Sequence, residues 1–101
     1  MLSLLLVLTR LSFGEIFGDI KAGDRYLTMA EVSLTCGTET VVAKTDSVGS
    51  FRIRSKANGK CRVSLKWKEQ TIGVDVVVFD RPTRYRFSIE EVDGKSSLKR
   101  L

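Results

Sequence analysis

The sequence predicts an all-β protein in which antiparallel strands form two packed sheets, and three observations predict this class. First, apolar and polar residues alternate along much of the chain, as in Phe51-Arg52-Ile53-Arg54, and a period of two is typical of half-buried strands. Second, turn-forming residues separate the alternating segments at short intervals. Third, no segment repeats apolar residues at helical spacing for long enough to predict a helix. Together these features favour a sandwich of seven strands.

The expected strands follow one another closely along the chain. In order, they cover residues 15–22, 30–36, 40–45, 50–55, 61–67, 70–79 and 83–89. We therefore expect a single domain over residues 15–91. Alternation is lost after residue 91, where the chain is polar and basic, so residues 92–101 are predicted to form a flexible basic tail.

The segment Thr45-Asp46-Ser47-Val48-Gly49-Ser50 raises the question of a metal or anion site. A calcium loop of the EF-hand kind needs further acidic ligands and a closing glutamate, which are missing from the residues that follow. Asp46 can instead accept hydrogen bonds from backbone amides two or three residues later, and Gly49 can take a positive φ. The segment is predicted to be a turn between two strands.

The first residues, MLSLLLVLTRLSFG, contain an apolar run of the length found in signal peptides. Ser12 and Gly14 place small residues where a signal peptidase cleaves, which predicts a signal peptide over residues 1–14 with cleavage before Glu15. No basic residue precedes the run, and Arg10 follows it. The alternatives are a hydrophobic first strand or a misassigned start.

The composition makes an enzyme an unfavoured interpretation. The chain has no histidine, which removes the commonest general base and the commonest zinc ligand. We expect a non-catalytic protein without a metal or cofactor. The formal net charge of +5 predicts weak attraction to polyanions without specificity.

Several basic residues have the outward phase of three predicted strands. If two of those strands are neighbours, they form a cationic face that can hold phosphates, anionic lipid headgroups or acidic glycans. The alternative is a solvated surface that protects the sheet edges. The candidate residues for this anion-binding face are Arg52, Arg54, Arg62, Lys66, Lys68, Arg84 and Arg86.

Cys36 and Cys61 have the inward phase of their strands, and two such thiols in one sandwich can come within disulfide distance. A disulfide between them would close a loop of about 25 residues and stabilise the fold by about 3.5 kcal/mol. Two buried free thiols in a reducing compartment are the alternative. We predict the disulfide, which agrees with export.

Two outward apolar positions break the alternation of the sixth predicted strand. Val77 and Phe79 face outward if Val78 faces inward, and Phe17 is a similar exception on the first strand. We expect a β-bulge or local cover to shield them. A dimer or partner contact is the alternative.

Four segments in order resemble the carboxypeptidase regulatory-like domains. They are Gly14-Glu15-Ile16-Phe17-Gly18-Asp19, Ala30-Glu31-Val32-Ser33-Leu34, Thr45-Asp46-Ser47-Val48-Gly49-Ser50-Phe51 and Gly59-Lys60-Cys61-Arg62-Val63-Ser64-Leu65. The resemblance implies a seven-stranded antiparallel Greek-key sandwich of the prealbumin-like (transthyretin-like) kind, without catalytic residues of its own. Such domains occur beside peptidases, in cell-surface proteins and on bacterial outer-membrane receptors, and they share no functional residues that could be assigned here.

These observations predict an exported bacterial protein, periplasmic or secreted, that serves as a binding or structural module stabilised by one disulfide. Its expected partner is a protein or a cell-envelope component, and no segment is predicted to span a membrane. The alternative function is binding to a polyanion such as an anionic lipid, a glycan or a nucleic acid through the basic strand faces.

Overall fold

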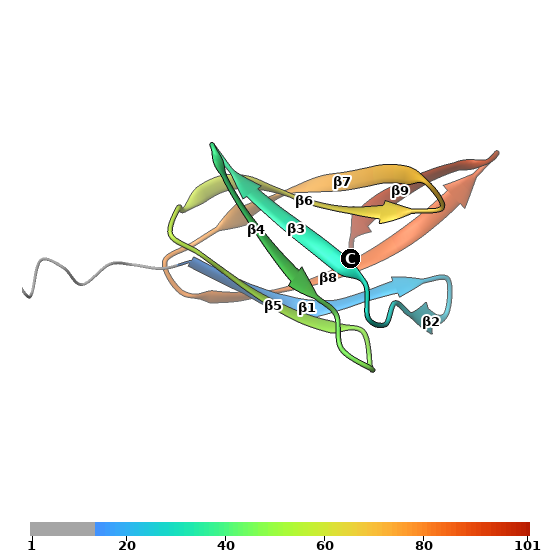
Figure 1. The fold of residues 1–101 in the computed structure, drawn as a ribbon, viewed down its shortest axis with the longest axis horizontal. Coiled ribbons are helices and arrows are strands. Elements are labelled where there is room, and N and C mark those ends of the chain that lie inside the picture. The colour runs from blue at the N-terminus through green and yellow to red at the C-terminus, as the bar shows by residue number, and fades with distance from the viewer. Residues whose placement is uncertain (1–13) are drawn as a thin grey trace, which may run out of the picture.

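The computed structural model describes residues 14–101, which form nine β-strands and no helix (Figure 1). All seven predicted strands are present, with ends that differ by a few residues. The two additional strands are the short β2 and the C-terminal β9. The strands are β1 Gly14–Ala22, β2 Arg25–Tyr26, β3 Glu31–Cys36, β4 Glu39–Lys44, β5 Ser50–Ser55, β6 Gly59–Trp67, β7 Gln70–Val78, β8 Pro82–Val92 and β9 Lys95–Arg100.

The strands make two sheets that pack as a sandwich (Figure 1). Sheet A has the order β2-β1-β8-β9, and β5 also pairs with β1. Strand β5 pairs with residues 14–19 of β1, whereas β2 pairs with residues 21–22, so the two share one edge of β1. Sheet B has the order β4-β3-β6-β7 and is antiparallel throughout.

One pairing corrects the prediction of a wholly antiparallel protein. Strands β1 and β8 are parallel neighbours over residues 15–22 and 82–89. Parallel neighbours need a crossover connection; between β1 and β8 the chain forms the four strands of sheet B and, between β4 and β6, adds β5 to sheet A (Figure 1). Alternation within each strand could not show this, because it does not identify the neighbouring strand.

The core lies between the inner faces of the two sheets. Phe87 is fully buried, and its ring lies 5.8 Å from the ring of Phe51 and 5.9 Å from that of Tyr85, measured between centroids. The predicted inward phases are correct for the buried residues of β3, β5 and β6, while Trp67 and Tyr85 are partly buried against the core. Burying each large aliphatic or aromatic side chain contributes about 1.5–3 kcal/mol. The core residues are Ile16, Ile20, Val32, Leu34, Cys36, Phe51, Ile53, Cys61, Val63, Leu65, Ile72, Val76, Val78, Phe87, Ile89 and Leu98.

Side chains also connect the edge strand β7 to sheet A. The Tyr85 hydroxyl donates to the carbonyl oxygen of Val77 at 2.7 Å and accepts from the Val77 amide at 3.1 Å. Further along β7, the side chain of Gln70 donates to the carbonyl oxygen of Gly94 and accepts from the Ser96 amide. An edge strand otherwise offers such backbone groups to other chains, so the Tyr85 bonds protect part of the β7 edge, and both sets of bonds hold the sheets together.

The prediction of a flexible tail over residues 92–101 is wrong. Strand β9 pairs with β8 from Val92↔Lys95 to Phe87↔Arg100, and Leu98 is buried. Asp93 and Gly94 both have positive φ and make the two-residue turn between these strands. An Asp-Gly pair is a strong hairpin signal, but a single inward apolar residue in β9 made the alternation hard to see.

Of the two expectations for the outward apolar residues, a bulge or local cover, the bulge in β7 is absent. The register with β6 is continuous from Trp67↔Gln70 to Gly59↔Val78, which leaves Val77 39% and Phe79 41% exposed. Two of the three outward apolar residues, Phe79 and Phe17, are covered locally instead, whereas Val77 is not. Guanidinium groups lie over the rings of Phe79 and Phe17, each 5.3 Å from the ring centroid.

Most of the predicted signal peptide, residues 1–13, lies outside the described part of the chain. Gly14, its last residue, begins β1 and pairs with Ser55. Within residues 14–101, no helix is long and apolar enough to cross a membrane.

Candidate functional site

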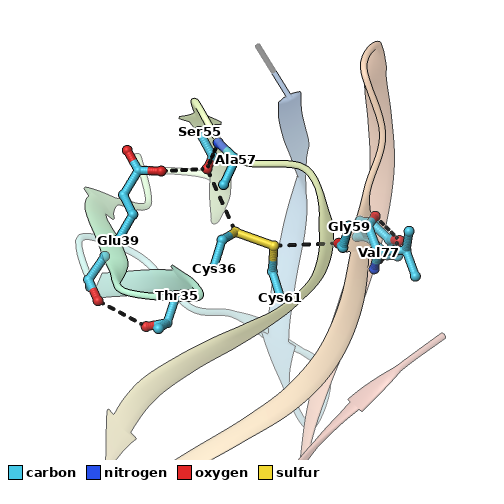
Figure 2. Close-up of a disulfide and its surroundings, with 10 residues drawn as sticks. Thr35, Cys36, Glu39, Ser55, Ala57, Gly59, Cys61 and Val77 are labelled. Atoms are coloured by element: carbon cyan, nitrogen blue, oxygen red, sulfur yellow. Dashed lines mark hydrogen bonds between the residues drawn. A yellow bond between two sulfur atoms is a disulfide. The ribbon is translucent and has the colours of Figure 1, made fainter. Parts of the chain in front are cut away.

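The predicted disulfide between Cys36 and Cys61 is present and joins neighbouring strands of sheet B (Figure 2). Strands β3 and β6 pair from Ser33↔Ser64 to Thr35↔Arg62, so the two cysteines are the next residues opposite one another. Their Cα atoms are 4.4 Å apart, and both residues are 4% exposed. The disulfide therefore continues the β3–β6 pairing where its hydrogen bonds end.

Strand β5 covers the disulfide through the buried residue Ser55 (Figure 2). The Ser55 hydroxyl lies 3.6 Å from Cys36 Sγ, donates to Glu39 Oε1 at 3.0 Å and accepts from the Ala57 amide at 3.1 Å. Because a buried hydroxyl without partners is costly, these bonds allow Ser55 to pack against the sulfur. They also connect sheet A, through β5, to β4 of sheet B.

The predicted anion-binding residues of β5 lie on the outer face of sheet A, where β1 supplies a carboxylate. Glu15 is 7% exposed and pairs with Arg52 and with Arg54, whose Nε lies 3.5 Å from Glu15 Oε1. The Arg52 guanidinium also covers the ring of Phe17. Glu15 therefore compensates one of the two positive charges of these arginines.

The predicted residues of β8 lie on the same face, on the other side of β1. Arg86 Nε is 3.4 Å from Asp19 Oδ1, and Arg84 is 4.0 Å from Asp19 Oδ2. A hollow of about 580 Å³ between these strands is lined by Lys44, Arg52 and Arg84, and also by Asp19 and Asp46. This face is mixed in sign rather than a cationic plate.

The remaining predicted residues lie elsewhere, so the seven do not form one face. Arg62 and Lys66 are on β6 in sheet B, and Arg62 pairs with Asp75 at 2.9 Å. Lys68 lies in the β6–β7 turn and pairs with Glu91 at 3.1 Å. The structure brings together only the four arginines of β5 and β8.

The Asp46 turn has the predicted chemistry. One carboxylate oxygen of Asp46 accepts from the amides of Val48 and Ser50, both at 2.9 Å, and Gly49 has a φ of 79°. The bonds from Ser50 and Val48 lower the pKa of Asp46 below its ordinary value, because they stabilise the ionised form. Among residues 14–101 no group of three or more metal-ligating side chains occurs.

A groove that the sequence analysis did not identify lies at the end of the sandwich where the β1–β2 and β6–β7 turns are found. This end groove has a volume of about 750 Å³, which is within the range of small-molecule sites. Its apolar lining includes Ala22, Leu27, Trp67 and Ile89, and its charged lining includes Arg25 and Glu91. Arg25 and Glu91 were hard to identify because each comes after the recognisable alternation of its segment.

Glu91 is the most fully partnered charged group of the end groove. It accepts from Trp67 Nε1 at 3.3 Å, Lys68 Nζ at 3.3 Å and Ser96 Oγ at 3.2 Å. The hydrogen bonds from Lys68 and then Trp67 lower its pKa below the ordinary value, because they favour the carboxylate. The indole ring is thus held in a defined orientation by an ionised Glu91.

The fold and the disulfide together define the class of this protein: a two-sheet β-sandwich with one disulfide bond in its core. No protein-family model matches the chain, and no curated protein matches it. Among solved structures, it is similar to a DUF3823 family protein from Parabacteroides merdae, with a TM-score of 0.59 and 10% sequence identity. The match covers 87% of this chain and 46% of that chain. At this identity the likeness shows the fold alone, and the chain spans about half the length of that protein.

Proposed function

We propose that this protein is an exported, non-catalytic binding or structural module of the carboxypeptidase regulatory-like type, stabilised by one disulfide. The observation that carries the proposal is the Cys36–Cys61 disulfide in the core. Disulfides of this kind persist in the periplasm and outside the cell, whereas cytosolic thiols are kept reduced. The apolar start of the chain supports the same location, because it has the length and small residues of a signal peptide.

Two further observations support this type of domain. All seven predicted strands are present in two packed sheets, as expected for a Greek-key sandwich of the prealbumin-like kind. Strands β2 and β9 are additions to that scheme. The non-catalytic role is supported by the sequence, since a chain without histidine lacks the usual general base of hydrolytic and transfer enzymes.

Export and the disulfide can be tested together in a bacterial host with a periplasm. The full chain and a matched chain that begins at Gly14 are expressed, and each is unfolded in denaturant and treated with an alkylating reagent before and after reduction, because thiols buried in the folded protein would not react. We expect the full chain to be found in the periplasm with a new amino terminus at Glu15 and with both cysteines unreactive until reduction. The matched chain should stay in the cytosol with both thiols reactive. A full-length cytosolic chain with Met1 intact would contradict export.

The alternative function, binding to a polyanion, is favoured by the four arginines that flank β1. Glu15 and Asp19 compensate two of the four positive charges, so any such binding should be weak and sensitive to salt. Retention on heparin at low salt that falls more in Arg52→Gln/Arg84→Gln than in the matched Arg62→Gln/Lys66→Gln variant would support this function. Passage of the wild type straight through the column at low salt would exclude it.

A further inference from the structure

The end groove holds an arginine on the inward side of its sheet. Ala22 pairs with Arg25, and paired residues of adjacent strands lie on the same face. Because Ala22 continues the inward series of Ile16 and Ile20, Arg25 lies on the inward face of sheet A, at the open end of the groove where it is exposed to solvent. Tyr26, the next residue, faces outward, where Lys21 Nζ lies 4.9 Å from its ring centroid.

Among the charged residues that line the end groove, Arg25 is the one whose side chain has no partner within residues 14–101. None of the side-chain hydrogen bonds, ion pairs or cation–π contacts of the described chain involves it, whereas Glu91 is bonded to Lys68, Trp67 and Ser96. The other carboxylate of the groove, Glu90, pairs with Lys99 at 3.4 Å. Once these pairs are counted, one positive charge remains uncompensated in the groove.

The apolar part of the groove suits a flat or extended hydrophobic group. The indole of Trp67 is fixed by its bond to Glu91 and packs partly against the core. Ala22, Leu27 and Ile89 add apolar surface around it. An aromatic ring of this kind provides a large contact area at a small cost in conformational entropy.

We propose that the end groove is a binding site for a small amphipathic organic anion, with its apolar body against Trp67 and its carboxylate or sulfonate on Arg25. This inference rests on the proposed role as a binding module and names a ligand class for it. The volume of about 750 Å³ accommodates such a molecule. The guanidinium can donate two parallel hydrogen bonds to a carboxylate or sulfonate, which gives the site a fixed orientation.

The single tryptophan of the chain makes this site directly measurable, because all tryptophan fluorescence comes from Trp67. The oxidised protein is titrated with anilinonaphthalene sulfonate and, separately, with phenylnaphthylamine, which has the same rings without the sulfonate. We expect saturable binding of the sulfonate probe at one site, with quenching of Trp67 and energy transfer to the probe. The uncharged probe should bind more weakly.

The variant Arg25→Gln distinguishes contact with the anion from general adsorption. Loss of a charge-assisted hydrogen bond should weaken binding of the sulfonate probe about tenfold or more and leave binding of the uncharged probe unchanged. Arg25→Lys should give an intermediate affinity, since it keeps the charge without the planar fork. Arg86→Gln, which removes an equal charge from the outer face of sheet A, should leave both affinities unchanged. Urea midpoints equal to that of the wild type would show that each variant is folded.

Three results would overturn the proposal. The first is binding without saturation or without a Trp67 response. The second is that Arg25→Gln weakens binding of the two probes equally, or that Arg86→Gln weakens binding of the sulfonate probe as much as Arg25→Gln does. The third is Trp67 emission that changes with protein concentration in the absence of probe, which would show a second copy in the groove. None of these results would bear on export or on the disulfide, which are tested by fractionation and alkylation.

Discussion

Reduction of the Cys36–Cys61 disulfide is expected to remove a large share of the stability of this protein. Both cysteines are 4% exposed and lie opposite one another on β3 and β6. After reduction, two buried thiols remain in nearly the same place and still pack as small apolar groups. The main change is therefore the loss of a constraint on the unfolded chain.

The size of that effect follows from the length of the closed loop. The cysteines are separated by 25 residues, and the loop-closure entropy for this length corresponds to about 3.5 kcal/mol at room temperature. A small domain has a total stability of about 5–15 kcal/mol. For a domain of this size, such a loss corresponds to a fall in the melting temperature of roughly 15–25 °C.

Urea denaturation with and without a strong reductant measures this contribution. The variant Cys36→Ala/Cys61→Ala is the matched control, because the reductant should not change its stability. We expect the variant to be slightly less stable than the reduced wild type, by about 1 kcal/mol, since it lacks the two sulfur atoms in the core. If reduction lowers the free energy of unfolding by less than about 1 kcal/mol, the loop-closure argument is wrong for this protein.

Three further predictions concern single side chains. Tyr85→Phe removes both hydroxyl bonds to the backbone of Val77 and should lower the free energy of unfolding by about 1–2 kcal/mol in urea; an unchanged midpoint would show that the edge of β7 does not need this hydroxyl. Glu69→Gly should raise the free energy of unfolding by about 0.5–1 kcal/mol, because Glu69 has a φ of 65° in a two-residue hairpin turn, whereas a loss of stability would mean that its side chain matters. The lowered pKa of Asp46 means that its ionised form stabilises the fold above the ordinary carboxyl pKa, near pH 4, and that this contribution is lost as the pH falls through the lower folded-state pKa. The variant Asp46→Ala should therefore be less stable than the wild type at neutral pH and should approach it in acid; a difference that persists at low pH would refute the role of the carboxylate.

The sequence was sufficient to predict seven of the nine strands of residues 14–101, the core-facing side chains of β3, β5 and β6, and the chemistry of one turn. The alternation around Cys36, Phe51 and Cys61 gave the correct inward positions, because side chains point to opposite faces at successive residues of any strand. Asp46 and Gly49 behave as predicted, since a turn of this kind depends on bonds within a few residues. Where a strand had only one inward apolar residue, as in β9 with Leu98, the pattern was too weak to be detected.

The charged faces and the end groove could not be predicted in this way. Placing Arg52 and Arg84 beside Glu15 and Asp19 required the pairing of β1 with both β5 and β8. Likewise, the predicted basic face included Arg62, which the structure places in the other sheet. Exposure and charge were correctly assigned to each residue, but the neighbours of each charge were not.

The sequence by itself determined that this chain forms extended strands, which side chains of several predicted strands enter the core and that two cysteines are among them. Only the tertiary structure decided that β8 runs parallel to β1, that the basic residues are divided between two sheets, and that Arg25 and Trp67 line one groove at the end of the sandwich. The physical reason is that alternation records only whether a residue faces the core or the solvent. The choice of neighbouring strand depends on hydrogen bonds and packing between segments that are distant along the chain.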